Sequence, residues 1–173
     1  MKLSTGIEKL DEILDGGIDS HSSVLILTDT MVDKATFAQH ILSRRIMEGD
    51  KAIYLTTTKL PSKILKNMYN HGFETEGIVF IDCISHTLGK ESPEKFVLQE
   101  KLTEVENAWK KTIELMDRAL RETEGFKFFV FDCLESFMGL GAETISKEIE
   151  KLKEDARDLR TTFLFLFTDW GYE

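Results

Sequence analysis

The stretch Ser22–Leu42, SSVLILTDTMVDKATFAQHIL, decides the fold that this sequence predicts. Its apolar run from Ser23 to Leu27 predicts a buried strand. From about Lys34 to Met47 apolar residues recur every three or four positions, which predicts an amphipathic helix. A strand that passes through a short loop into a helix is the frame of a phosphate-binding loop, because a helix N-terminus attracts anions. Residues 28–35 are therefore the first candidate for a functional site.

The loop itself departs from the phosphate-binding pattern. A Walker A motif reads G-x-x-x-x-G-K-[ST], whereas residues 28–35 read TDTMVDKA. Lys34 is present, but both framing glycines are absent and Ala35 stands at the hydroxyl position. The nearest hydroxyl comes one residue later, at Thr36. The sequence therefore predicts a degenerate Walker A loop, in which Lys34 and Thr36 are candidate remnants of a nucleotide site.

Composition limits the domain count and the partners. At 173 residues with 42% hydrophobic content, the chain can bury one sizeable core, so we expect a single domain over residues 1–173. The net charge of −9 argues against nucleic acid or an anionic membrane as a partner, because nothing would attract the chain to phosphate. The sequence has no run of about 20 apolar residues and no signal-peptide pattern, so we expect a cytoplasmic protein.

Beyond the opening stretch, apolar periodicity alternates between strand and helix patterns, which predicts a three-layer α/β/α sandwich with a mainly parallel sheet. Further strands are expected at 52–57, 77–83, 127–133 and 161–170. Further helices are expected from Pro61 to about Gly72, from about Pro93 to Thr123, and from Glu143 to Arg160. Near the N-terminus, Thr5 and Glu8 have the spacing of a capping box for a first helix.

The cysteines and histidines give no metal-binding pattern. Cys83 and Cys133 lie far apart without C-x-x-C spacing, so we expect reduced core residues rather than a zinc site or a disulfide. The histidines share no ligand spacing and are expected on the surface or in loops: His21, His40, His71 and His86. No metal site is predicted.

Three stretches together resemble a known family: STGIEKLDEILDGGI at 4–18, the strand, loop and helix at 23–47, and KFFVFD at 127–132. This combination resembles the RecA superfamily and most closely its KaiC-like ATPases, which carry a TGI...LD..L.GGGI signature directly before the P-loop strand. The resemblance covers nearly the whole chain. It implies a RecA/KaiC-like P-loop NTPase core, a Walker B-like strand at 127–132 and a prokaryotic, archaeal source.

The resemblance also indicates where the chemistry would be. Thr28, Met31 and Asp33 stand at positions that resemble the three loop glycines, and Thr58 and Lys59 stand where the family has a pair of glutamates. If the loop positions need left-handed torsions, each side chain there costs about 1–2 kcal/mol, and a carboxylate repels a polyanion. Without a carboxylate at 58 or 59, nothing there orients an attacking water, so no catalytic residue is expected.

Several candidates have two interpretations. Lys34 either binds an anion or is a solvated first-turn lysine, and we favour the second. Asp132 either ligates a metal, or bonds loop amides or caps the following turn, and both interpretations remain open. Asp82 and Asp132 each end a strand with an Asp-Cys pair, followed in the second case by Glu135. The two aspartates form either a paired-carboxylate metal site or an accidental similarity of two strand ends, and we favour the second interpretation.

Two surface features could receive a partner. Lys59, Lys63 and Lys66 cluster around the short helix after residue 60, either as a site for an acidic partner or nucleotide or as a solvated helix face, and we favour the face. Trp170 and Tyr172 stand near the end of the chain, where aromatic side chains can anchor a partner.

Three functions follow from the resemblance. The first is a KaiC-like pseudo-ATPase that has lost ATP hydrolysis and, we expect, nucleotide binding, and that acts as a protein-interaction or regulatory module without ATP or magnesium. The alternative is a divergent ATP-binding protein or ATPase of the KaiC/RecA type that uses Lys34 and Asp132. The third is a subunit that assembles with an active KaiC-like paralogue. Family members continue past the last strand, so a self-contained hexamer is not expected.

Overall fold

A parallel sheet forms the centre of the computed structural model, which describes residues 1–171. Over these residues its strands are β3 (Ser23–Asp29), β4 (Lys51–Thr56), β5 (Val79–Asp82), β6 (Phe96–Val97), β7 (Lys127–Asp132) and β8 (Thr161–Asp169). The spatial order is β3-β8-β7-β4-β5-β6, and every pair is parallel. The predicted α/β architecture is confirmed.

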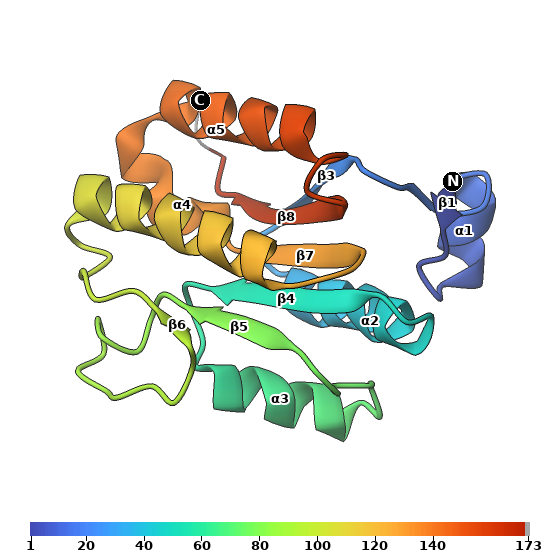
Figure 1. The fold of residues 1–173 in the computed structure, drawn as a ribbon, viewed down its shortest axis with the longest axis horizontal. Helices are drawn as coiled ribbons and strands as arrows, with labels where there is room; N and C mark the ends of the chain where they lie inside the picture. The colour runs from blue at the N-terminus through green and yellow to red at the C-terminus, as the bar shows by residue number, and fades with distance from the viewer. Residues whose placement is uncertain (172–173) are drawn as a thin grey trace.

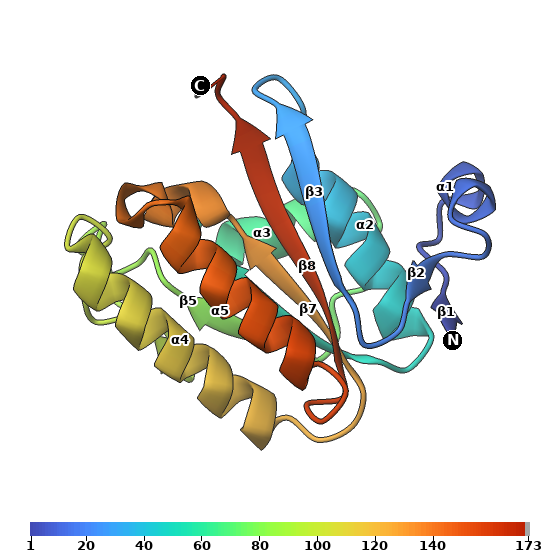
Figure 2. The ribbon, with the colours of Figure 1, turned by 90° about the horizontal axis from the view of Figure 1, so that it is seen from above.

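Helices cover both faces of this sheet (Figure 1). Helices α2 (Lys34–Met47) and α3 (Pro61–Asn70) lie on one face, and α4 (Val105–Glu122) and α5 (Ala142–Asp155) lie on the other (Figure 2). Side chains of β4 alternate between the two layers: Tyr54 packs with the α2 and α3 core, and Leu55 with the α4 and α5 core. Because β4, β7 and β8 are buried on both faces, they read as continuous apolar runs.

A small N-terminal unit lies beside the sheet. It contains β1 (Lys2–Leu3), which pairs antiparallel with β2 (Ile18–Asp19), and the short helix α1 (Glu8–Ile13) between them. The predicted capping box is wrong, because the N-cap residue is Ile7 and it makes no side-chain cap. The Thr5 hydroxyl donates to Asp11 Oδ1 at 2.6 Å instead, and the Thr5 amide donates to the same oxygen at 2.8 Å. The Thr5 hydroxyl thus bonds a charged carboxylate in the first turn of α1, six residues on, and does not cap the helix.

Two predicted helix bounds are wrong. The helix expected from Pro93 begins at Val105, because Phe96 and Leu98 are buried against the sheet and Phe96–Val97 pairs with β5. Leu98, Leu102 and Val105 have the spacing of one helix face, although the helix begins only at Val105. The helix expected to reach Arg160 ends at Asp155, and Arg160 itself has a left-handed φ of 50°.

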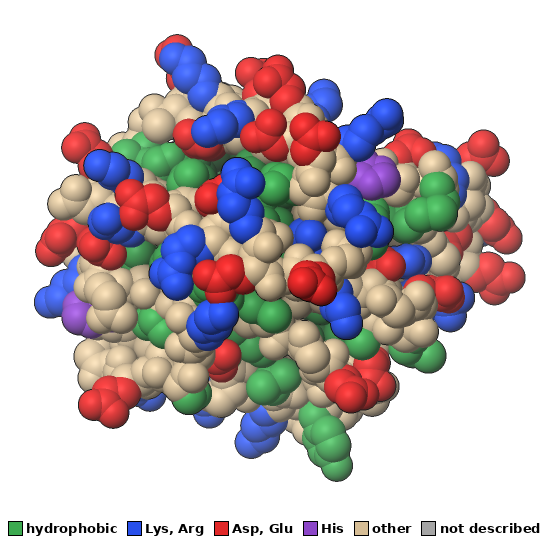
Figure 3. All heavy atoms as spheres, in the orientation of Figure 1, with side chains coloured by type: hydrophobic (Ala, Val, Ile, Leu, Met, Phe, Trp, Pro, Cys, Tyr) green, Lys and Arg blue, Asp and Glu red, His purple; other side chains and the backbone are tan. Residues whose placement is uncertain are grey.

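Charge is mixed over the α4 and α5 side of the molecule. Figure 3 shows lysine and arginine side chains interspersed with aspartate and glutamate on this face. Of the helices in residues 1–171, none combines the length and the apolar character needed to cross a bilayer.

Candidate functional site

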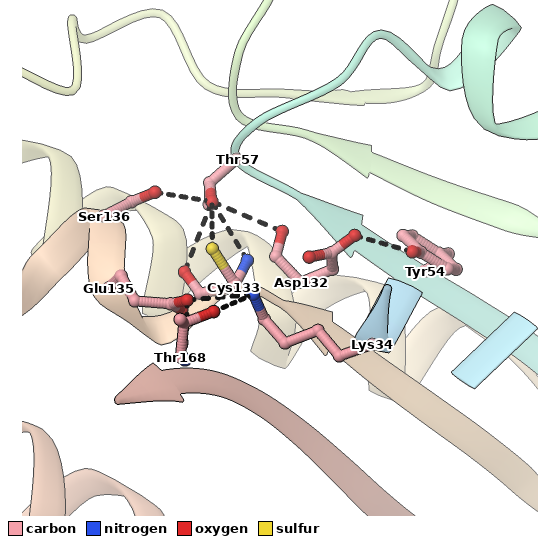
Figure 4. Close-up of polar contacts among 8 residues, drawn as sticks. All are labelled: Lys34, Tyr54, Thr57, Asp132, Cys133, Glu135, Ser136 and Thr168. Carbon is pink, nitrogen blue, oxygen red and sulfur yellow. Dashed lines mark hydrogen bonds and ion pairs between the residues drawn. The ribbon is translucent and has the colours of Figure 1, made fainter. Parts of the chain in front are cut away.

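The carboxyl ends of β3, β8 and β7 meet at one edge of the sheet. Lys34 comes to this edge from the first turn of α2, Asp132 ends β7 and Thr168 lies near the end of β8 (Figure 4). Glu135 follows from the 3-10 helix η1 (Leu134–Leu140). Open α/β sheets bind ligands at the carboxyl ends of their strands, so the topology brings both predicted residues, Lys34 and Asp132, to the expected place.

The loop between β3 and α2 ends in a carboxylate that caps the helix. Asp33 is the N-cap residue of α2 and accepts from the Thr36 amide at 3.0 Å and from the Thr36 hydroxyl at 2.7 Å. Burial raises the pKa of Asp33, but these bonds and the nearby Lys59 charge outweigh burial and hold the pKa below its usual value. A negative group of the chain itself therefore occupies the helix N-terminus, the position where a phosphate would bind.

Backbone strain is not what distinguishes this loop. Among the residues that the structure describes, the non-glycine residues with positive φ are Asp15, His21 and Arg160, and none of them lies in 28–35. The condition for the predicted cost, left-handed torsions at the loop positions, is therefore not met in this structure. Its tip is open to solvent, with Met31 94% exposed.

Lys34 is paired rather than solvated, which contradicts the favoured interpretation. Its Nζ lies 3.0 Å from Glu135 Oε1, and both side chains are only 15% exposed. Lys34 Nζ also donates to the Thr168 hydroxyl, and the Thr168 amide donates to the same Glu135 oxygen at 2.7 Å. Burial raises the pKa of Glu135, but hydrogen bonds, including those from Thr168 and Lys34, outweigh burial and lower it. The ion pair ties α2 to β8 and η1.

Asp132 is buried and bonds a tyrosine rather than the loop amides that one interpretation proposed. Tyr54 on β4 donates its hydroxyl to Asp132 Oδ2 at 2.7 Å, and the Asp132 side chain is almost fully enclosed. Burial raises the pKa of Asp132 and the Glu135 charge adds to this, while Tyr54 and Lys34 oppose it. The net shift is upward, so burial exceeds the stabilisation that the neighbours supply.

Sequence reasoning did not identify Tyr54, Thr57 or Thr168 as members of this cluster. The Thr57 amide donates to the Asp132 carbonyl at 2.8 Å, and the Thr57 hydroxyl accepts from the Cys133 amide at 3.0 Å (Figure 4). Tyr54 lies inside β4, Thr57 directly follows its last residue, and Thr168 is the next-to-last residue of β8. For the two threonines the usable signal was a hydroxyl residue near the end of a predicted strand, since parallel strands align their ends; Tyr54 gave no such signal.

Asp82 and Asp132 lie in separate hydrogen-bond networks. Asp82 accepts from the Ser85 hydroxyl at 2.6 Å and from the Ile84 and Ser85 amides. Thr56 pairs with Asp82 on one side and with Asp132 on the other, so the two backbones are about 10 Å apart, twice the strand spacing. Within residues 1–171 no group of three or more His, Cys, Asp or Glu could hold a metal ion.

The two cysteines lie in the core as free thiols, as expected. Cys83 and Cys133 are both free and buried, and burial raises the pKa of each thiol to about 12. They are therefore protonated at neutral pH.

Thr58 and Lys59 are exposed on the turn after β4. Lys59, Lys63 and Lys66 line one surface pocket of about 490 Å³, where their side chains are exposed, as expected for a solvated helix face. Trp170 is 57% exposed, and Tyr172 lies outside the described residues.

Comparison with known proteins agrees with this architecture. The family model described as "ATPase: KaiC" matches residues 3–169. A UPF0273 protein of Thermotoga maritima is 29% identical over 172 residues, which cover 95% of this chain and 69% of that protein. A UPF0273 protein of Pyrococcus furiosus is 29% identical over 128 residues, which cover 70% of this chain and 50% of that protein. The chain thus spans about half to two thirds of these relatives.

A circadian clock protein KaiC of Prochlorococcus marinus is 37% identical over 79 residues, which cover 45% of this chain and 16% of the clock protein. The crystal structure of a KaiC-like protein from Pyrococcus horikoshii superimposes with a TM-score of 0.63 at 17% identity. The match covers 99% of this chain and 72% of that structure, and it shows that the fold is shared. With the family model spanning residues 3–169, the chain belongs to the KaiC family of RecA-like ATPases.

Proposed function

We propose that this chain is a KaiC-like pseudo-ATPase that has lost ATP hydrolysis and nucleotide binding and that acts as a protein-interaction or regulatory module. The observation that carries the proposal is that carboxylates of the chain itself occupy both positions where a phosphate would be bound. Asp33 caps the N-terminus of α2, and Glu135 neutralises Lys34. A nucleotide would have to displace both.

The cost of that displacement is electrostatic. The Glu135 carboxylate shares one oxygen between Lys34 and the Thr168 amide, and the pair is mostly enclosed. An entering phosphate would leave this carboxylate without its cation and close to the ligand charge, where screening by water is weak. At the helix N-terminus, Asp33 would repel the same ligand at short range.

Magnesium and hydrolysis lack their usual partners here. Ala35 has no hydroxyl, and the Thr36 hydroxyl already donates to Asp33 and accepts from Asn67 Nδ2 at 3.0 Å. The turn after β4 carries Thr58 and Lys59, so no carboxylate there could orient a water. The residues present therefore do not fit a bound Mg–ATP, and we assign no catalytic step to them.

Isothermal titration calorimetry of the purified chain with ATP and ADP, with and without magnesium, tests the proposal. We expect no binding at ligand concentrations up to the millimolar range. The double variant Asp33→Gly/Glu135→Gln should gain weak binding of the nucleotide, because it frees the helix N-terminus and the lysine. The matched control Glu143→Gln removes an exposed carboxylate on α5 and should gain nothing.

Micromolar ATP binding with turnover by the unmodified chain would reject the proposal. It would support the alternative, a divergent ATPase in which Lys34 and Asp132 act, particularly if Lys34→Ala abolished it. For the partner, we expect an active KaiC-like paralogue to co-purify from the native cell and to be identified by mass spectrometry. The circadian clock role of the Prochlorococcus marinus relative is a property of that protein.

A further inference from the structure

The α3 side of the sheet carries positive charge on an otherwise acidic chain. Residues 51–73, which span β4 and α3, contain four lysines and none of the 31 aspartate and glutamate residues of the chain. Three of these lysines, Lys59, Lys63 and Lys66, are exposed and line the pocket of about 490 Å³, which we call the basic pocket. Helix α3 lies at the β5 end of the sheet, far from β3 (Figure 1).

The three lysines of the basic pocket have no ionic partner within residues 1–171, where every ion pair joins other side chains. The carboxylates that flank the segment are engaged elsewhere: Asp50 pairs with Arg45 at 2.7 Å, and Glu74 accepts from the next two backbone amides. Asp33 lies close enough for the Lys59 charge to act on it, but its oxygens cap α2. Exposure alone would fit a solvated helix face. Three cations that lack counter-charges on an acidic chain in addition form a local attraction for an anion.

The basic pocket also offers apolar contact. Leu60, Ile64 and Leu88 line it beside the lysines, and the large apolar side chain of Leu88 is 51% exposed. No aromatic side chain among residues 1–171 lines the pocket, so a nucleobase finds no surface for stacking. Cations next to aliphatic side chains fit a ligand that carries both carboxylates and an apolar group.

The lysines form a row. It begins with Lys59 on the turn before α3 and continues on the helix with Lys63 and Lys66, which share a helix face because they are three residues apart. The seven residues from the first to the last lysine correspond to about 10 Å at the helical rise. Carboxylates on alternate residues of an extended peptide repeat about every 6.6 Å, so a peptide can follow the whole row. A single phosphate group would reach only part of it.

We propose that the basic pocket binds an acidic segment of a partner protein, with aspartate or glutamate side chains against the lysines and an apolar side chain against Leu88. This names a partner class for the interaction module proposed above, and it rests on that function. The net charge of −9 opposes such a partner at long range, but exposed charges more than about 8 Å away are largely screened at physiological ionic strength. Lysines in contact with the segment therefore outweigh the distant carboxylates, and they select the partner by charge.

NMR titration of the full ¹⁵N-labelled chain with a deca-glutamate peptide tests the proposal. We expect the backbone amide signals of residues 59–70 and of Leu88 to shift, while those of α5 stay in place. Binding should weaken as salt increases, because salt screens exposed charge pairs. Placing one leucine in the middle of the peptide should lower the Kd about threefold or more, and Leu88→Gln should abolish that gain.

A triple variant tests the role of the lysines: Lys59→Gln/Lys63→Gln/Lys66→Gln. Each exposed charge pair contributes up to about fivefold in affinity, so loss of all three should raise the Kd of deca-glutamate about tenfold or more. The matched control removes three exposed lysines from α5 and should leave the Kd unchanged: Lys147→Gln/Lys151→Gln/Lys153→Gln. Far-UV circular dichroism checks that each variant is folded.

The proposal is overturned if deca-glutamate does not bind, if the control variant loses as much affinity as the triple variant, or if tripolyphosphate binds the pocket and the peptide does not. Its failure is distinguishable from failure of the proposed function. A chain that binds neither ATP nor the peptide has no such docking surface but has still lost nucleotide binding. A chain that binds and hydrolyses ATP rejects the proposed function, whatever the peptide does.

Discussion

The ion pair between Lys34 and Glu135 should make the largest polar contribution to stability at the candidate site, and truncating Glu135 tests this. Glu135→Ala removes the anion that faces Lys34 Nζ at 3.0 Å and the acceptor of the Thr168 amide at 2.7 Å. The Thr168 residue is 4% exposed, so water reaches its amide poorly. The variant therefore leaves a mostly buried cation and a buried amide without their acceptor.

The magnitude follows from those two losses. A buried group left without its partner costs about 1–3 kcal/mol, and breaking a fully buried ion pair costs about 3–5 kcal/mol. Because both side chains keep 15% exposure, we expect an intermediate loss of about 2–3 kcal/mol in the free energy of unfolding. Lys34→Met should cost a similar amount. The double variant should cost clearly less than the two together, which gives a coupling energy of about 1–2 kcal/mol.

Urea unfolding followed by circular dichroism measures all three variants. The matched control is the ion pair between Lys147 and Glu143 on α5, which has a similar distance of 2.9 Å but side chains that are 72% and 85% exposed. Its coupling should be no more than about 0.5 kcal/mol, because water screens an exposed pair. If the coupling at Lys34 and Glu135 is as small as in this control, the reasoning about the closed site is wrong.

The pH dependence of the same pair has a definite sign. The pKa of Glu135 lies below its ordinary value of 4.5 in the folded chain. The folded state therefore prefers the ionised form, so this contribution to stability is present above about pH 4.5 and is lost as the pH falls through the lowered pKa. We expect the free energy of unfolding, measured by urea titration between pH 3 and 7, to depend less on pH at the acid end in Glu135→Gln than in the unmodified chain.

Three further predictions concern buried groups. Asp132→Asn should leave stability at pH 7 nearly unchanged or raise it, because burial penalises the Asp132 charge and raises its pKa. Asp132→Ala should instead cost about 1–3 kcal/mol, because it leaves the Tyr54 hydroxyl without its acceptor. Urea unfolding of both variants separates these outcomes. Gly17→Ala should destabilise the N-terminal unit, because a Cβ at Gly17, whose φ is 119°, would lie 2.1 Å from the Leu3 carbonyl oxygen. Amide hydrogen exchange in that unit should become faster, and unchanged protection would contradict the predicted clash. Cys83 and Cys133 should resist Ellman's reagent at pH 8 until urea is added, because burial raises both pKa values to about 12; rapid labelling of the folded chain would show that they are accessible.

Much of the fold could be predicted from the sequence because its central strands β4, β7 and β8 are buried on both faces. β7 and α2 have the predicted bounds to within a residue, since an apolar run and a 3.6-residue stripe are local patterns. The helix predicted over residues 93–104 is wrong because that prediction also relied on a local pattern. Leu98 and Leu102 have helical spacing, but Phe96 pairs with β5, and periodicity carries no information about strand partners.

The sequence by itself determined which groups reach the site: a lysine at the start of α2, an aspartate at the end of β7, and no glycine or catalytic carboxylate at the positions that the family resemblance marks. Only the tertiary structure decided what those groups do. Lys34, Glu135 and Thr168 are distant in the chain, and they meet because β8 lies between β3 and β7. Charge pairing depends on distance in space and on exclusion of water, and both are properties of the packed sheet rather than of any single segment.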